Sequence, residues 1–100
     1  MQVKYLKSTI PDFRWWSLYY SKVFPQGRPA AGASYLNILN FLERNPYIAA
    51  PVEERDLRRL LIPNTPFMIV YRIRQNRLEI VRLWDSRQKP IYGLKKAKDT

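Results

Sequence analysis

The hydrophobic spacing of this chain changes at Asn45-Pro46, and that change limits the order of elements into which it can fold. Before this point, apolar residues recur three and four positions apart, which predicts helices over Asp12–Phe24 and from about Pro29 to Arg44. After it, short runs rich in β-branched and aromatic residues predict three strands. These runs are Arg55–Ile62, Phe67–Arg74 and Arg77–Trp84. The weakly alternating start, Gln2–Lys7, predicts one more strand.

Turn signals separate these elements. Pro25-Gln26-Gly27-Arg28 interrupts the two helices, and their short connection predicts an antiparallel helix hairpin. Pro63-Asn64-Thr65-Pro66 is a turn, and Gln75-Asn76 fits a two-residue hairpin loop. The predicted fold class is therefore α+β, in the order β-α-α-β-β-β, with the helix hairpin packed on one face of a mostly antiparallel sheet. We expect a single domain over residues 1–100, with a basic tail from about residue 86 that is mobile when the chain is alone.

The loop at Gln75-Asn76 also predicts which residues share a face of the sheet. In this register Arg72 lies opposite Glu79 as a cross-strand ion pair. The face expected to pack on the helices holds Phe67, Ile69, Tyr71, Ile73, Leu78, Ile80, Arg82 and Trp84. The other face holds Met68, Val70, Arg72, Glu79, Val81 and Leu83. Because that second face is still apolar, we expect something to cover it.

The composition limits the catalytic and metal-binding groups that the chain can offer. The chain has no cysteine and no histidine, which excludes disulfides and thiolate metal sites and removes the commonest general acid–base group. We expect no metal and no cofactor. The formal net charge of +10 favours a polyanionic or an acidic protein partner. Since no apolar run approaches the roughly 18 residues of a membrane span and no signal peptide is evident, we expect a cytoplasmic protein without a membrane partner.

One segment carries a recognisable motif. Arg58 is followed by Pro63-Asn64-Thr65-Pro66-Phe67-Met68-Ile69-Val70-Tyr71-Arg72, then by the strand Leu78–Leu83 and by Arg87. This pattern resembles the RelE/ParE toxin family, whose members read Arg, Thr-Pro-aromatic, an apolar pair and Tyr-Arg before a β-hairpin. The resemblance implies the toxin of a type II toxin–antitoxin system, neutralised by a cognate antitoxin protein.

The family divides by mechanism. Ribonuclease members cut messenger RNA on the ribosome with basic residues and often a C-terminal tyrosine, whereas ParE-like members inhibit DNA gyrase. By alignment, the basic positions of the ribonucleases are Arg59, Leu61 and Met68 here. Leucine and methionine cannot stabilise the charge of a phosphate, so inhibition of gyrase is favoured. A ribosome-dependent endoribonuclease is the alternative, with Arg59, Arg87 and Tyr92 as its catalytic residues.

Two sets of residues are predicted to bind partners. The target-binding set is Arg58, Arg82, Trp84 and Arg87. Arg87 is the strongest of these because it follows the last strand, where the active face of the family opens, whereas a structural stacking contact is favoured for Arg82. The antitoxin-binding set is Met68, Val70, Val81 and Leu83. An antitoxin segment that is disordered until bound would cover this apolar face, and its acidic residues would meet the positive charge.

A further alternative is a basic nucleic-acid-binding domain that uses the sheet and the tail. Such a sheet needs two or three exposed aromatic side chains at an RNA-recognition spacing, and the strands lack them. The aromatic residues of the first helix are predicted to pack in the core rather than to stack on bases. They are Trp15, Trp16, Tyr19 and Tyr20.

Overall fold

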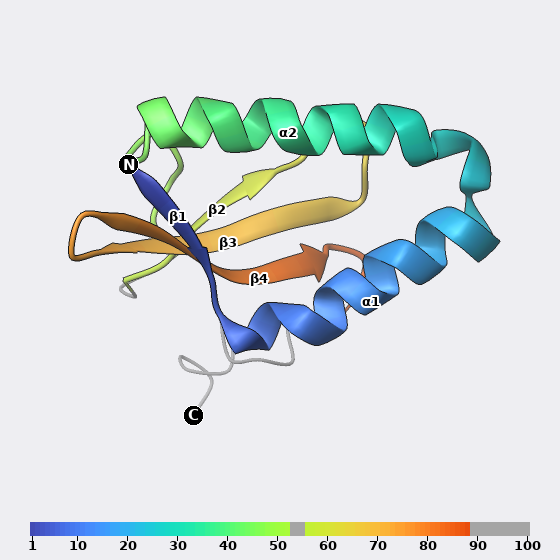
Figure 1. Ribbon diagram of the computed structural model, residues 1–100, viewed down its shortest axis with the longest axis horizontal. Coiled ribbons are helices and arrows are strands. Elements are labelled where there is room, and N and C mark those ends of the chain that lie inside the picture. Colours follow the sequence, from blue (N-terminus) through green and yellow to red (C-terminus); the bar gives the residue numbers. More distant parts are fainter. Residues whose placement is uncertain (53–55, 89–100) are drawn as a thin grey trace.

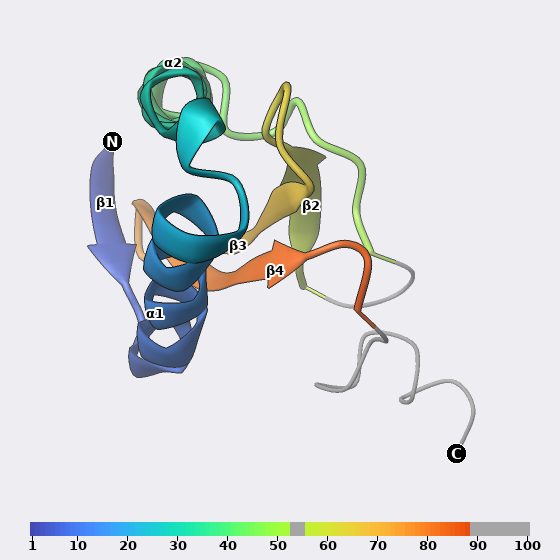
Figure 2. The ribbon, with the colours of Figure 1, turned by 90° about the vertical axis from the view of Figure 1, so that its right-hand side faces the viewer.

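Two helices cover one face of a sheet in the computed structural model, which describes residues 1–52 and 56–88 (Figures 1 and 2). The regular elements are β1 (Gln2–Tyr5), α1 (Ile10–Leu18), α2 (Arg28–Arg44), β2 (Arg58–Leu61), β3 (Phe67–Arg74) and β4 (Arg77–Asp85). A 3-10 turn (Lys7–Thr9) precedes α1. A π-helical turn (Tyr19–Val23) and a second 3-10 turn (Pro25–Gly27) join the helices.

The helices begin and end at the residues that favour such boundaries. A proline lies in the first turn of each helix, Pro11 in α1 and Pro29 in α2, where the missing N–H costs nothing. The side chain of Asn45 donates a hydrogen bond to the carbonyl oxygen of Phe41 at 3.0 Å, and Pro46 follows. The predicted first helix ran on to Phe24. Its last part is instead the π-helical turn, which the Phe24 N–H closes on the Tyr19 carbonyl at 2.8 Å.

The described strands form one sheet in the order β1-β4-β3-β2. β1 runs parallel to β4, and the other neighbours are antiparallel. The two helices therefore bring the chain back across the sheet before the last three strands are laid down. This arrangement confirms the predicted α+β class, the β-α-α-β-β-β order and the helix layer on one face.

The β3–β4 hairpin follows the predicted register only near its turn. Gln75 and Asn76 both have positive φ, 52° and 61°, as a two-residue hairpin turn requires. From Arg74↔Arg77 to Tyr71↔Ile80 the pairing is as predicted, but the next pair is Val70↔Arg82. Val81 is thus an extra residue, a β-bulge, and beyond it the pairing moves by one position.

The bulge corrects the predicted faces. Because residues directly opposite each other share a face, Leu83 joins Ile69 on the face that packs on the helices. Arg82 and Trp84 move to the other face, opposite Val70 and Met68. We call this second face, which points away from α1 and α2, the outer face. Leu83 was predicted to lie on it, and that prediction is wrong.

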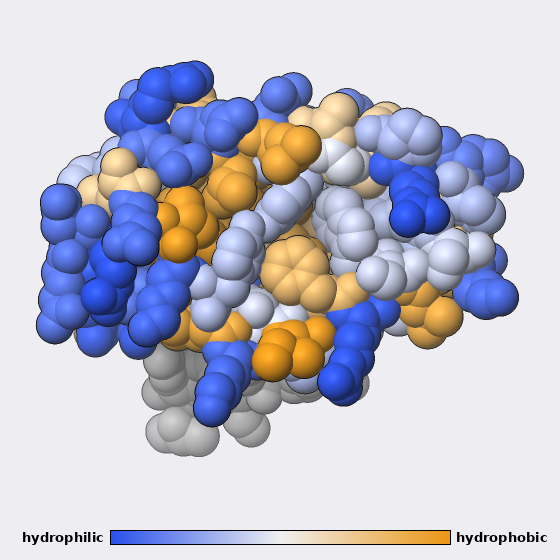
Figure 3. Space-filling model, viewed as in Figure 1, coloured by the Kyte–Doolittle hydropathy of each residue, from blue (hydrophilic) through white to orange (hydrophobic). Residues whose placement is uncertain are grey.

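The core between helices and sheet is rich in aromatic rings. Tyr19 and Tyr20 are buried, and Trp15 and Trp16 pack on the same cluster, which confirms their predicted core role. The rings of Trp16 and Phe67 are 4.8 Å apart. Apolar side chains show between α1 and α2, while hydrophilic ones cover the end of the molecule at the β3–β4 turn (Figure 3). In the described part of the chain, no helix has the length and apolar character needed to cross a membrane.

Candidate functional site

The outer face carries a small apolar cluster that the chain itself partly covers. Val70 and Trp84 are buried there together with Val52, which comes from the segment between α2 and β2. Met68 and Leu57 pack against them. Figure 2 shows this segment passing on the side of the sheet opposite the helices. The expectation that something covers this face is confirmed for its middle, where residues of the chain itself pack on it.

The predicted antitoxin-binding residues are therefore not equivalent. Leu83 is 1% exposed and Val70 is fully buried, so neither offers surface to a partner. Met68 and Val81 are half-buried on the outer side. Leu61 on the edge strand β2 is paired with Met68 and is 49% exposed, although it was not placed in this set. The alternation along β2 marks Leu61 as outward-facing once its pairing with β3 is known.

The positions expected to hold the basic residues of a ribonuclease lie together on this face. Arg59 is paired with Val70, and Leu61 with Met68, so the three positions follow one another along the outer side of β2 and β3. Arg59 is exposed and supplies a charge, whereas its two neighbours supply apolar surface. Tyr92, the fourth candidate for this chemistry, lies outside the described residues, as does the basic tail beyond residue 88.

Arg87 is fixed at the end of β4 by a buried carboxylate. Its Nε and Nη2 donate to the two oxygens of Asp85 at 2.9 and 2.7 Å, and its guanidinium lies 4.8 Å from the centre of the Tyr19 ring. Trp15 Nε1 donates to the same carboxylate at 3.0 Å. Burial by itself would raise the pKa of Asp85, but these hydrogen bonds outweigh it and the pKa is lowered. Asp85 also raises the pKa of Arg87 further, so the pair stays ionised.

Arg82 is held by a second carboxylate, at the point where β1 ends. Both Nε and Nη2 donate to Asp12, at 2.6 and 2.8 Å, and the Leu83 N–H donates to the same side chain at 2.9 Å. β1 ends at Tyr5, so its backbone does not reach Leu83 on β4. The Asp12 side chain accepts the hydrogen bond of the Leu83 N–H in place of a strand residue. The predicted stacking of Arg82 on an aromatic ring stays a prediction.

Arg58 stabilises the segment that follows α2. Its Nη1 donates to the carbonyl oxygens of Ala49 and Tyr47, at 2.6 and 3.2 Å, and its guanidinium lies 5.3 Å from the centre of the Tyr47 ring. Of the predicted target-binding arginines, all three therefore have internal partners. Arg87 keeps the most surface, since its side chain is 53% exposed.

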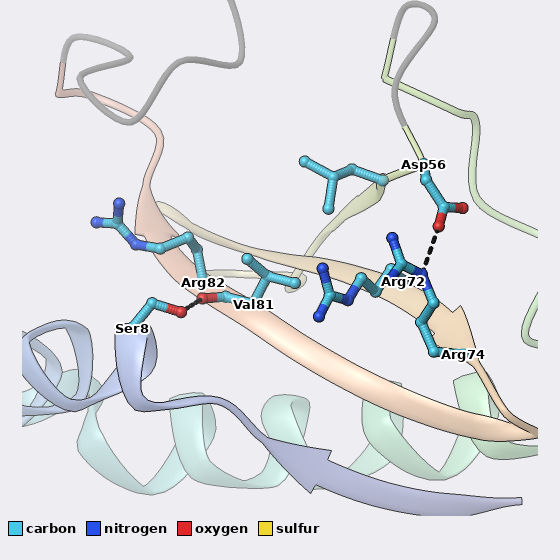
Figure 4. Close-up of a pocket in the computed structure, with 7 residues that line it drawn as sticks. Ser8, Asp56, Arg72, Arg74, Val81 and Arg82 are labelled. Atoms are coloured by element: carbon cyan, nitrogen blue, oxygen red, sulfur yellow. Dashed lines mark hydrogen bonds and ion pairs between the residues drawn. The ribbon is translucent and has the colours of Figure 1, made fainter.

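A basin of about 560 Å³, which was not predicted from the sequence, lies on the outer face. Its walls include Ser8, Asp56, Arg72, Arg74, Val81 and Arg82 (Figure 4). Within it, Arg72 Nε donates to Glu79 at 2.7 Å, which confirms the predicted cross-strand pair. Hydrogen bonds from Arg72 and Arg77 lower the pKa of Glu79, so this carboxylate is ionised at neutral pH. The basin joins Ser8, near the N-terminus, to residues between 56 and 82, and no local sequence pattern contains all of them.

Comparisons with known proteins support the fold. No protein-family model matches the chain, and a search of curated protein sequences found no match. Among solved structures, the chain is similar to one from the chromosomal ParDE TA system of P. aeruginosa. The two chains are 20% identical, with a TM-score of 0.65, and the match covers 83% of this chain and 92% of the other. The ParE-like arrangement of two helices on a four-stranded mixed sheet is thus shown for residues 1–52 and 56–88.

Proposed function

We propose that this protein is the toxin of a type II toxin–antitoxin pair, held inactive by a cognate antitoxin. The observation that carries the proposal is the agreement of the whole fold with a chain from the ParDE system, over most of both chains. Of the residues that resemble RelE/ParE toxins, Phe67, Tyr71 and Arg72 lie in β3, and Thr65-Pro66 directly precedes it. Because fold alone does not define function, the preference between the two mechanisms rests on the side chains at the candidate site.

The antitoxin is proposed to bind the outer face beside β2. This strand is at the end of the sheet. Pro51 forms a bridge with its first residue, Arg58, and the edge beyond, along Arg59–Leu61, can pair with an added strand. Leu61 and Met68 offer the apolar surface next to that edge, and the charge of +10 favours an acidic partner. We expect a short acidic protein encoded next to this one to co-purify with it. Replacing Leu61 by Lys should weaken the complex, whereas the same change at Leu36, exposed on α2, should not.

Inhibition of DNA gyrase is the mechanism that we favour. Cleavage of RNA needs groups that stabilise negative charge on the phosphate, and Arg59 is accompanied on its part of the face by Leu61 and Met68. Apolar surface next to a basic residue suits contact with a protein target better. An endoribonuclease is the second candidate, because Arg87 is both exposed and held in one orientation by Asp85.

Pulse-labelling of DNA and protein synthesis after induced expression tests the two mechanisms in cells. Gyrase and ribosomes are both in the cytoplasm, which is where we expect the protein to act. If gyrase is the target, DNA synthesis falls first, and the purified protein inhibits supercoiling by purified gyrase. If protein synthesis stops first and Arg87→Ala abolishes that effect while Lys22→Ala does not, the protein is a ribonuclease. Normal growth with the protein fully expressed and folded would reject the toxin proposal.

A further inference from the structure

Two arginines that line the basin on the outer face, Arg72 and Arg74, donate hydrogen bonds through Nε and not through their terminal nitrogens, Nη1 and Nη2. Arg72 is bound through Nε to Glu79, and Arg74 through Nε to Asp56 at 2.8 Å. No described residue accepts a hydrogen bond from Nη1 or Nη2 of either side chain. These two nitrogens of a guanidinium carry parallel N–H groups that match the two oxygens of a carboxylate or a phosphate.

A nearly buried carboxylate holds the Arg72 guanidinium in place. Glu79 is nearly buried, with 6% of its side chain exposed, and it also accepts a hydrogen bond from Arg77 at 3.0 Å. Arg72 is 30% exposed and lies between Val81 and the Arg74–Asp56 pair (Figure 4). Its orientation is therefore set before any ligand arrives, which lowers the entropy cost of binding.

The charge of the basin favours a carboxylate over a nucleic-acid phosphate. Of the arginines in the lining, Arg72 and Arg74 form ion pairs with Glu79 and Asp56, and Arg82 with Asp12. Arg77 also contacts Glu79, so four arginines meet three carboxylates, which leaves one net positive charge. That balance suits a single carboxylate, whereas binding to a nucleic-acid backbone draws on several cations that have no anionic partner.

The apolar residues in the lining of the basin also favour a carboxylate of a protein over a nucleic-acid phosphate. Leu57 and Val81 supply apolar surface in the basin, and the apolar cluster of Val70 and Trp84 lies on the same face. An acidic residue on a protein segment brings apolar neighbours with it, which a sugar–phosphate chain does not.

We propose that this basin is a carboxylate-binding site that receives an acidic side chain of a protein partner, with Arg72 as its principal ligand. The identification of this partner as the antitoxin rests on the proposed function, whereas the carboxylate site rests on the basin residues alone. Arg72 donates both terminal N–H groups to the carboxylate, Arg74 adds a second cation two residues along the strand, and Leu57 and Val81 contact the apolar residue beside the acid.

Titration of the isolated protein with acetate, followed by NMR, tests the site without any partner. At constant ionic strength, acetate should shift the Arg72 Nε–H and the amides of Ser8 and Val81 with saturation. Replacing Arg72 by Gln should weaken binding by roughly tenfold, the equivalent of about 1.4 kcal/mol of charge-assisted hydrogen bonding. Replacing it by Lys, which keeps the charge but loses the paired N–H groups, should weaken binding as well. Arg28→Gln removes the same charge from α2 and should leave binding unchanged.

Three outcomes would overturn the proposal. These are shifts that grow without saturation, equal effects of Arg28→Gln and Arg72→Gln, or saturation by inorganic phosphate and not by acetate. The last result would assign the basin to a phosphate ligand. Because the titration does not use toxicity, saturable acetate binding by a protein that proves harmless would reject the toxin proposal and keep the carboxylate site. Toxicity without acetate binding would reject the site alone.

Discussion

Replacement of Asp12 by Ala should destabilise the fold strongly. The Asp12 side chain is 10% exposed and accepts three hydrogen bonds, two from Arg82 and one from the Leu83 backbone. Ala leaves the Leu83 N–H without its acceptor and removes the ion pair of Asp12 with the Arg82 guanidinium, whose side chain is 16% exposed. It also removes a negative charge from the first turn of α1.

The expected loss in the free energy of unfolding follows from the buried groups that lose their partner. Removing one partner of a buried ion pair costs about 3–5 kcal/mol, and residual exposure at this site places the expected loss near about 3 kcal/mol. For a chain of this length, that corresponds to a fall in Tm of roughly 12–24 °C. Asp12→Asn keeps an oxygen for the Leu83 N–H and should cost about 1–2 kcal/mol.

Urea denaturation followed by tryptophan fluorescence measures these losses. Asp56→Ala is the matched control, because the Asp56–Arg74 pair is largely exposed and should contribute less than about 1 kcal/mol. An unchanged slope of the free energy of unfolding against urea would show that only the native state is affected. If Asp12→Ala and Asp56→Ala cost the same free energy of unfolding, Asp12 does not stabilise the contact between α1 and β4.

Three further predictions use the same measurement or extend it. Because the pKa of Asp85 is lowered from its ordinary 3.8 in the folded state, its contribution to stability is full above that value and is lost as the pH falls through the lowered pKa. Wild type should therefore lose more stability than Asp85→Asn between pH 7 and pH 3, and equal losses would contradict the assigned ion pair. Gly32 lies within α2 with open space where a Cβ would be, so Gly32→Ala should stabilise the protein by about 0.5–1 kcal/mol; destabilisation would mean that the site is filled. Arg58→Ala should cost about 1–2 kcal/mol and speed hydrogen exchange at the Val52 N–H, which is bonded to the Leu57 carbonyl, whereas exposed Arg59→Ala should do neither.

Local patterns were enough to predict most of the fold. The prolines at the helix starts and Asn45-Pro46 at the end of α2 act within one turn, and so does the Gln75-Asn76 loop with its two positive φ angles. For the same reason the Arg72–Glu79 pair, close to that loop, was predicted correctly. Its partners are fixed by a count of residues across a short turn.

The candidate site could not be predicted as fully. The apolar outer face and the exposed Arg87 followed from strand alternation and from the family resemblance, but the internal partners of Arg58 and Arg82 did not. Arg82 meets Asp12 and Arg58 meets Ala49 only after the sheet and the segment between α2 and β2 have come together. A basic residue without a nearby acid in the sequence therefore gave no sign of whether it would face solvent or a carboxylate.

The sequence by itself determined the order of elements, their class and the hairpin turn, because each depends on hydrophobic spacing or on turn residues close together in the chain. Tertiary structure alone decided the β-bulge at Val81 and everything that depends on it. No residue near Val81 marks the bulge, and its carbonyl oxygen accepts a hydrogen bond from Ser8, 73 positions away, at 2.6 Å. Since strand alternation has a period of two, one extra residue exchanges the faces of all residues beyond it. That single residue places Leu83 in the core and brings Arg82 and Trp84 to the outer face, where we expect the partner to bind.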